Sequence, residues 1–138
     1  MNPAPTLVVI PTYNEAENIG SVADQVLRLD ASFHILVVDD GSPDGTGDLV
    51  ESLQERHPER IHLIRREGKQ GLGTAYIAGF KYALERDYGF VCEMDADLSH
   101  NPADLERLVA PVQAGEADVV VGSRYIGGVR IMNWPLSR

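Results

Sequence analysis

Short apolar runs alternate along this sequence with longer segments of helical periodicity, and this alternation restricts the chain to few folds. The apolar runs, which are typical of buried strands, lie at residues 6–10, 34–38, 61–64, 90–94 and 118–121. Helical patterns cover residues 16–29, 46–56, 72–84 and 102–114. The alternation predicts an α/β fold with a largely parallel central sheet and helices on both faces. No repeat or linker interrupts it, so we expect residues 1–138 to form a single domain.

The loops after three of the expected strands are rich in acidic residues. These loops cover residues 11–15, 39–44 and 95–99. In open α/β sheets ligands bind outside the carboxyl ends of the strands, so the fold alone would gather the three loops on one rim. The first loop leads into a helix, where Asn14 and Glu17 have the spacing of a capping box. The rim is therefore the predicted binding edge.

The segment Asp95-Ala96-Asp97 ends the fourth expected strand. In an extended segment its two carboxylates point the same way, about 6–7 Å apart, and repel unless a cation or protons lie between them. Carboxylates, a diphosphate and water are a normal shell for Mg²⁺ or Mn²⁺, and Ser99 and His100 lie close enough to add a neutral ligand. The alternative is a helix-capping aspartate beside a solvated one.

Other rim segments admit either a binding role or a purely local one. Asp39 and Asp40 could accept hydrogen bonds from a ribose or a base edge, or they could only shape the following turn. Tyr13 could lie against a base and Glu15 could bind an exocyclic amine or a hydroxyl; the alternative is a helix start alone. The glycine-rich segment 68–75 could bind phosphate or simply lead into a helix, because it does not match the P-loop pattern.

Charge and composition exclude some classes of protein. The chain has 12 Lys and Arg against 21 Asp and Glu, a net charge of −9, which argues against non-specific nucleic-acid binding. Cys92 is the only cysteine, so no intrachain disulfide can form. No apolar run approaches the roughly 20 residues of a membrane span, and no signal-peptide pattern opens the chain. We therefore expect a soluble, cytoplasmic chain.

Several segments together resemble glycosyltransferase family 2, whose fold is called GT-A and is Rossmann-like. They are VVIPTYNEAENI (8–19), VVDDGSPDGT (37–46), GLGTAYIAGF (71–80), MDADLSHNP (94–102), VGSRYIGG (121–128) and NWPLSR (133–138). These segments span nearly the whole chain in the order of the family. The wording of GLGTAY and MDADLSH is most similar to the dolichyl-phosphate (polyprenyl-phosphate) mannosyl synthases within it.

The resemblance implies a role for each matching position. The implied substrate-binding residues are Pro11, Tyr13, Glu15, Val38, Asp40, Asp95, Ala96, Asp97, Ser99, Arg124 and Arg138. The first five would form the nucleoside site for the guanosine of GDP-mannose. Asp95, Asp97 and Ser99 would hold Mg²⁺ or Mn²⁺ with the sugar diphosphate, and the two arginines match basic residues near the diphosphate and the acceptor phosphate. Asp97 and Arg124 would be catalytic, because they neutralise the leaving diphosphate.

The implied reaction is inverting transfer of mannose from GDP-mannose to a polyprenyl (dolichyl) phosphate. A lipid phosphate is already ionised at neutral pH, so no general base is required and the protein aligns the reactants and neutralises charge. Such an acceptor implies peripheral contact with the cytoplasmic face of a membrane. The chain stops at Arg138 inside an expected helix, so we expect the domain to be incomplete at its C-terminal end.

Three alternatives remain open at this point. The first keeps the lipid acceptor and changes the donor, for example to UDP-glucose. The second is a non-catalytic nucleotide-binding module. The third is a nucleotidyltransferase, although the glycine-rich, Arg/Lys-containing loop that such enzymes usually place after the first strand is missing here. The oligomeric state is not predicted.

Overall fold

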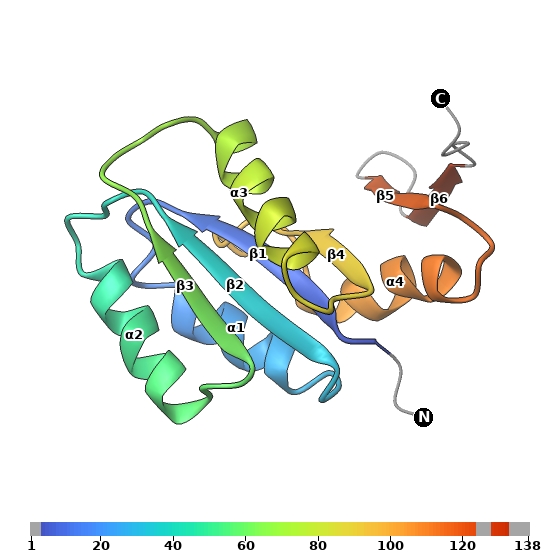
Figure 1. Ribbon diagram of the computed structural model, residues 1–138, viewed down its shortest axis with the longest axis horizontal. Coiled ribbons are helices and arrows are strands. Elements are labelled where there is room, and N and C mark those ends of the chain that lie inside the picture. Colours follow the sequence, from blue (N-terminus) through green and yellow to red (C-terminus); the bar gives the residue numbers. More distant parts are fainter. Residues whose placement is uncertain (1–3, 124–127, 133–138) are drawn as a thin grey trace. The chain divides into compact units, whose positions relative to one another are not determined.

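The computed structural model describes residues 4–123 and 128–132, and the chain forms two compact units, Met1–Pro102 and Ala103–Arg138. Figure 1 colours both units along the sequence. The first unit contains all three loops of the predicted rim, so the site can be built from that unit alone. The single-domain expectation stays a prediction.

The first unit is built on a four-stranded parallel sheet with the strand order β3-β2-β1-β4. Its strands are β1 (Thr6–Thr12), β2 (Phe33–Asp39), β3 (Ile61–Arg65) and β4 (Phe90–Glu93). Its helices are α1 (Ile19–Leu27), α2 (Thr46–Arg56) and α3 (Leu72–Leu84). Val8 of β1 pairs with Ile35 on one side and with Cys92 on the other, so β1 is a central strand. The alternating α/β pattern predicted for this part of the chain is confirmed.

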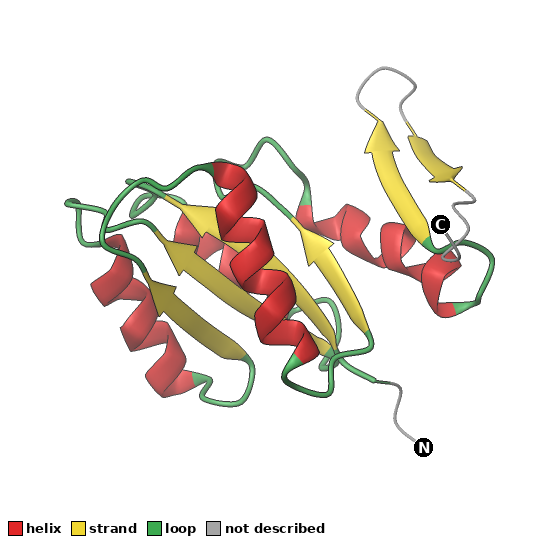
Figure 2. Ribbon diagram, turned by 45° about the horizontal axis from the view of Figure 1, so that its top comes forward, coloured by secondary structure: helices red, strands yellow, loops and turns green. Residues whose placement is uncertain are grey.

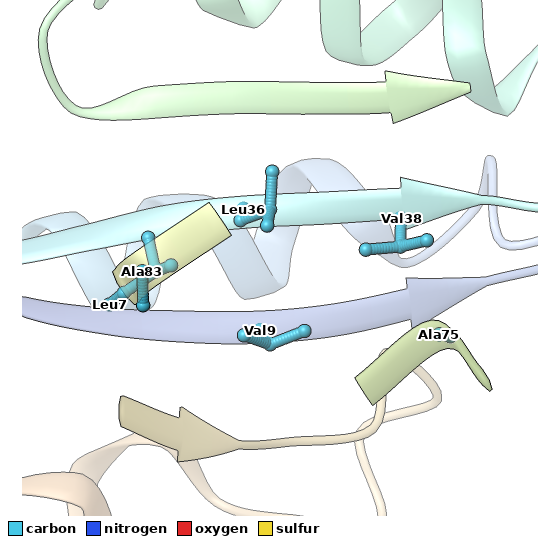
Figure 3. Close-up of a cluster of buried hydrophobic side chains, with 6 residues drawn as sticks. All are labelled: Leu7, Val9, Leu36, Val38, Ala75 and Ala83. Carbon is cyan, nitrogen blue, oxygen red and sulfur yellow. The ribbon is translucent and has the colours of Figure 1, made fainter. Parts of the chain in front are cut away.

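Different helices cover the two faces of the sheet (Figures 1 and 2). On one face α3 packs against β1 and β2, and Figure 3 shows the buried cluster between them, which consists of Leu7, Val9, Leu36, Val38, Ala75 and Ala83. Because side chains alternate along a strand, the intervening Val8 and Val37 face the opposite side, where α1 and α2 pack together. Helices on both faces are therefore confirmed.

The first helix begins later than the sequence predicted. α1 starts at Ile19 and its N-cap makes no side-chain capping bond, so the capping box of Asn14 and Glu17 is wrong. Asn14 has a left-handed backbone, with φ 57°. Side chains of the loop after β2 and of the first residue of α2 accept the N–H groups of three successive residues: Asn14 to Ser42 Oγ, Glu15 to Thr46 Oγ1 and Ala16 to Asp44 Oδ2. The Ser42 hydroxyl thus accepts the N–H of Asn14 that the capping box would have assigned to Glu17.

The second unit contains a helix and a small antiparallel sheet. The 3₁₀ turn η1 (Pro102–Asp104) precedes α4 (Leu105–Gln113), and β5 (Val119–Ser123) pairs with β6 (Gly128–Met132). The fifth predicted strand exists but is not part of the parallel sheet, and β6 lies in a tail that was expected to be irregular. The physical reason is that β5 and β6 satisfy each other's backbone groups as a hairpin. Within the described residues, no helix is both long and apolar enough to cross a bilayer.

Candidate functional site

The carboxyl ends of the parallel strands meet at one edge of the sheet, as the predicted rim requires. β1 ends at Thr12 and β2 at Asp39, and these two residues are register partners. Asp39 is in turn the partner of Arg65, where β3 ends, and β4 ends at Glu93 beside β1. The residues that follow these strand ends therefore form the candidate site.

Asp39 is a buried residue that ties two loops together. Its side chain is 2% exposed, and its carboxylate accepts the Thr12 hydroxyl at 2.7 Å. It also accepts the hydroxyl of Ser42 at 2.6 Å and the backbone N–H of Ser42 at 3.1 Å. These bonds join the end of β1 to the turn after β2. Of the two roles open for this carboxylate, the structure supports the turn-shaping one.

Asp40 forms a bidentate ion pair with Arg66. Arg66 Nε lies 2.6 Å from Asp40 Oδ1 and Nη2 lies 2.9 Å from Oδ2, while the two side chains are only 10% and 13% exposed. The guanidinium also donates to Thr74 Oγ1 at 2.9 Å and to the Gly71 carbonyl at 3.4 Å. Arg66 thus fastens the start of α3 to the end of β2. Sequence reasoning missed it, although a basic residue just past β3, beside two acids at the end of β2, was a usable signal.

A pocket of about 280 Å³ lies between the loop after β1, the end of β2 and the start of α3. Its lining residues are Pro11, Thr12, Tyr13, Glu15, Asp40, Lys69, Gly71, Leu72 and Ala75. Four of the five residues assigned to the nucleoside by resemblance are therefore brought together here. The fifth, Val38, is fully buried in the cluster under α3, so its side chain supports the pocket from the core.

Two residues form an aromatic and cationic wall of this pocket. Tyr13 is 38% exposed, and the ammonium of Lys69 lies 4.2 Å from the centroid of its ring, a cation–π contact. Lys69 belongs to the glycine-rich segment 68–75, for which a phosphate role was left open. The structure brings this segment to the pocket, although sequence reasoning placed neither Lys69 nor Leu72 among the site residues.

The Asp95-Ala96-Asp97 segment follows β4 at the same edge of the sheet. Asp95 Oδ1 accepts the Tyr76 hydroxyl at 3.4 Å, and Oδ2 lies 3.8 Å from His100 Nε2. The backbone N–H of Asp95 donates to His100 Nδ1 at 3.1 Å. Ala96 is buried, at 3% exposure, and anchors the loop between the two acids. Burial raises the pKa of Tyr76, and the negative charge of Asp95 raises it further, so this hydroxyl stays a hydrogen-bond donor.

Asp97 is exposed to solvent, and its carboxylate accepts a hydrogen bond from within its own loop. Asp97 Oδ1 accepts the backbone N–H of Ser99 at 3.0 Å. Hydrogen bonds from the side chain and backbone of Ser99 hold the pKa of Asp97 below its usual value. The carboxylate is therefore ionised at neutral pH, as a metal ligand must be. Ser99 is its hydrogen-bond partner here, and a metal-ligating role for Ser99 stays a prediction.

The donor set of this loop fits a divalent cation that takes most of its ligands from a substrate. The described residues contain no cluster of three or more His, Cys, Asp or Glu side chains arranged to hold a metal. Two carboxylates on one loop, Asp95 and Asp97, are instead the usual protein share of a Mg²⁺ or Mn²⁺ site completed by phosphate oxygens and water. Arg124 and Arg138, predicted near the phosphates, lie outside the described residues.

A second pocket, of about 400 Å³, lies near the opposite edge of the sheet. Its lining residues are Pro5, His34, Glu59, His62, Tyr82, Arg86, Asp87 and Tyr88. His34 Nδ1 lies 2.9 Å from the Tyr88 hydroxyl oxygen, and burial lowers the pKa of both His34 and His62. None of the predicted site residues lines this pocket, so the candidate site is the smaller pocket on the rim.

Comparison with known proteins places the chain in a family. Residues 7–138 match the family model described as Glycosyl transferase family 2, and the chain belongs to that family. It is 52% identical to the polyprenol monophosphomannose synthase of Mycolicibacterium smegmatis over 96% of this chain and 50% of the relative. It is 48% identical to the undecaprenyl-phosphate mannosyltransferase of Micrococcus luteus over 96% and 53%. The chain thus spans about half the length of these curated relatives.

Solved structures share the fold of this chain. A mannosyltransferase from Pyrobaculum calidifontis in complex with GDP-Man and Mn²⁺ is 29% identical, with a TM-score of 0.54 over 59% of this chain and 25% of that one. The glucosyl-3-phosphoglycerate synthase of Mycobacterium tuberculosis, in complex with Mn²⁺ and UDP, is 25% identical, with a TM-score of 0.60 over 82% and 41%. Both relatives were crystallised with a divalent metal, and the fold class predicted from the sequence is confirmed.

Proposed function

We propose that this chain forms the donor-binding part of an inverting mannosyltransferase that transfers mannose from GDP-mannose to a polyprenyl phosphate. The observation that carries the proposal is the rim pocket, in which Pro11 of β1, Tyr13 and Glu15 of the loop after it, and Asp40 after β2 converge. An aromatic ring, a carboxylate and a free cation within about 280 Å³ suit a nucleotide. Two curated relatives are named as a polyprenol monophosphomannose synthase and an undecaprenyl-phosphate mannosyltransferase, and these names support the choice of sugar and of lipid acceptor.

In this proposal each part of the rim has one task. Tyr13 lies against the base, and Glu15 accepts hydrogen bonds from the guanine amine or a ribose hydroxyl. Asp95 and Asp97 hold Mg²⁺ or Mn²⁺, which would neutralise the charge that develops on the leaving diphosphate. The ionised acceptor phosphate needs no general base, so the remaining task of the protein is alignment. Arg124 is proposed to assist at the diphosphate and Arg138 at the acceptor phosphate.

The proposed acceptor sets where the chain would work. A polyprenyl phosphate resides in a membrane, so the protein would meet it from the cytoplasmic face by peripheral contact. The donor-binding half of the reaction can be tested separately from transfer, because the candidate pocket lies wholly within the first unit.

The decisive experiment is calorimetric titration of the chain with GDP-mannose and UDP-glucose, with Mn²⁺ and then with chelator. We expect metal-dependent binding of GDP-mannose, and Asp97→Ala should weaken it at least about ten-fold. Asp24→Ala removes an acid on the exposed surface of α1, where it forms an ion pair with Arg28 outside the rim, and should bind like the wild type. Undiminished binding by Asp97→Ala would refute the metal assignment.

Two further results would change the proposal. Preference for UDP-glucose would retain the lipid acceptor and replace the donor, and the UDP-bound structure of a relative makes this the second candidate. Binding of GDP-mannose without turnover on a short-chain polyprenyl phosphate would leave a nucleotide-binding module.

A further inference from the structure

One basic residue lines the rim pocket, and a second is bonded to two of its lining residues, Asp40 and Gly71. Arg66 stands behind the pocket wall, and its guanidinium is engaged by Asp40, Thr74 and Gly71. Lys69 lines the pocket, and within the described residues its ammonium makes no ion pair. Its one recorded partner is the ring of Tyr13. Lys69 is therefore the cation of this pocket that is available to a ligand.

The Lys69–Tyr13 contact places the ammonium over one face of the Tyr13 ring, and both residues line the pocket. Tyr13 as a residue is 38% exposed, and the ammonium lies 4.2 Å from the centroid of its ring. A base that stacks on the covered face of this ring must displace the ammonium from it. A phosphorylated ligand offers the displaced ammonium a phosphate oxygen, which is a stronger partner than the ring. An uncharged nucleoside has no phosphate oxygen to bind the displaced ammonium.

The acidic side chains that line the pocket give a second reason why a phosphate group needs Lys69. Asp40 is neutralised by Arg66, whereas Glu15 contributes a carboxylate whose recorded side-chain partner is the neutral amide of Asn18. Without Lys69 the lining would carry a net negative charge and would repel a phosphate. The lysine side chain can also move alone, because Arg66 fixes the chain before it and bonds the carbonyl of Gly71 after it.

We propose that Lys69 makes the pocket selective for phosphorylated nucleosides, by covering the ring of Tyr13 until a phosphate draws its ammonium away. Lys69 is thus a specificity-determining residue, with opposite effects on two kinds of ligand. The proposal rests on the proposed function in one respect, namely that the pocket takes a nucleotide.

The test compares GDP with guanosine at one fixed Mn²⁺ concentration, so that the metal contributes equally to every variant, on the wild type, Lys69→Gln and Lys69→Arg. Lys69→Gln should weaken GDP about ten-fold, because the phosphate loses its cation. The same variant should bind guanosine about two- to five-fold more tightly, because the ring is uncovered. Lys69→Arg keeps the charge and should retain the preference of the wild type for GDP.

A third substitution separates the ring from the charge. In a Tyr13→Ala background the gain in guanosine affinity on Lys69→Gln should vanish, while the loss for GDP should persist. Equal changes for GDP and guanosine would overturn the inference and leave the proposed function intact. If the wild type binds uracil nucleotides instead, UDP and uridine replace the pair and the same opposite signs are expected. Failure of the wild type to bind any nucleotide, with or without metal, would overturn both proposals.

Discussion

The packing of α3 on β1 makes a sharp prediction about Gly79. A Cβ at this position would lie 2.5 Å and 2.6 Å from the two Cγ atoms of Val9 and 3.1 Å from its Cβ. Val9 is fully buried, and it belongs to β1, which is paired on both sides. A β-branched side chain on a central strand has no free rotamer into which it can move. Gly79→Ala must therefore displace α3 or distort the sheet.

The magnitude follows from two opposing terms. Overpacking of a core costs about 1–3 kcal/mol, and the upper half of that range applies because neither partner can yield. Replacement of a helical glycine by alanine returns about 1 kcal/mol of helix propensity. We expect Gly79→Ala to lower the free energy of unfolding by about 1–2 kcal/mol. Gly73→Ala is the matched control: it lies in the same helix, a Cβ there meets nothing within 4 Å, and it should gain about 0.5–1 kcal/mol.

Equilibrium unfolding in urea, followed by circular dichroism, measures both variants. The dependence of free energy on urea must be the same in each for the comparison to hold. Val9→Ala removes the two methyl groups that the new Cβ meets, so it should cost less in the Gly79→Ala background than in the wild type. If Gly79→Ala is as stable as Gly73→Ala, then α3 does not approach β1 as closely as described and the reasoning is wrong.

Two other predictions concern charge. Arg66→Gln leaves the nearly buried carboxylate of Asp40 without its partner and should cost about 2–4 kcal/mol of unfolding free energy. The control Arg65→Gln breaks partly exposed ion pairs and should cost less than about 1 kcal/mol. Equal costs of the two variants in urea denaturation would contradict the buried pair. Burial lowers the pKa of His34 and His62, so the unfolded chain binds more protons just below pH 6.5, and stability should fall as pH falls from that value to the lower pKa values of the folded state. Replacement of His34 and His62 by Gln should flatten this fall in stability between pH 7.5 and 5.5. The control His57→Gln, on the exposed surface, should leave the fall unchanged. Identical pH profiles for the two variants would show that His34 and His62 do not cause the pH dependence.

The sequence predicted the parts of the site that follow from the periodicity of strands. Alternating apolar runs located the strand ends, and parallel strands place those ends at one edge whatever the loops do. That argument, with the resemblance, was enough to bring Pro11, Tyr13, Glu15 and Asp40 into one pocket. The apolar run 34–38 predicted that Val38 lies in a buried strand, which the structure confirms, but the resemblance did not say whether its side chain or its backbone faces the ligand.

The features that the sequence missed depend on the paths of loops. The pattern of Asn14 and Glu17 satisfied a local capping rule, yet Ser42 and its neighbours in the next loop bond the backbone instead. Lys69 reaches Tyr13 across more than fifty positions of sequence, and no local pattern encodes that contact. The partner of β5 was missed for a different reason: β6 contains Gly128 and Arg130 and lacks a continuous apolar run.

The alternation of side chains along β2 explains why the two adjacent acids at its end, Asp39 and Asp40, have different roles. Leu36 and Val38 point toward α3, so Asp40, with the same parity, falls on that face and lines the pocket. Asp39 has the opposite parity and bonds Thr12, its register partner on β1. The alternation was visible in the sequence, but which face carried the pocket was not, because that depends on where α3 begins. Arg66, which the sequence analysis overlooked, holds the start of α3 by its bonds to Thr74 and Gly71. Its ion pair with Asp40 therefore joins a lining residue of the pocket to the helix that begins beside it.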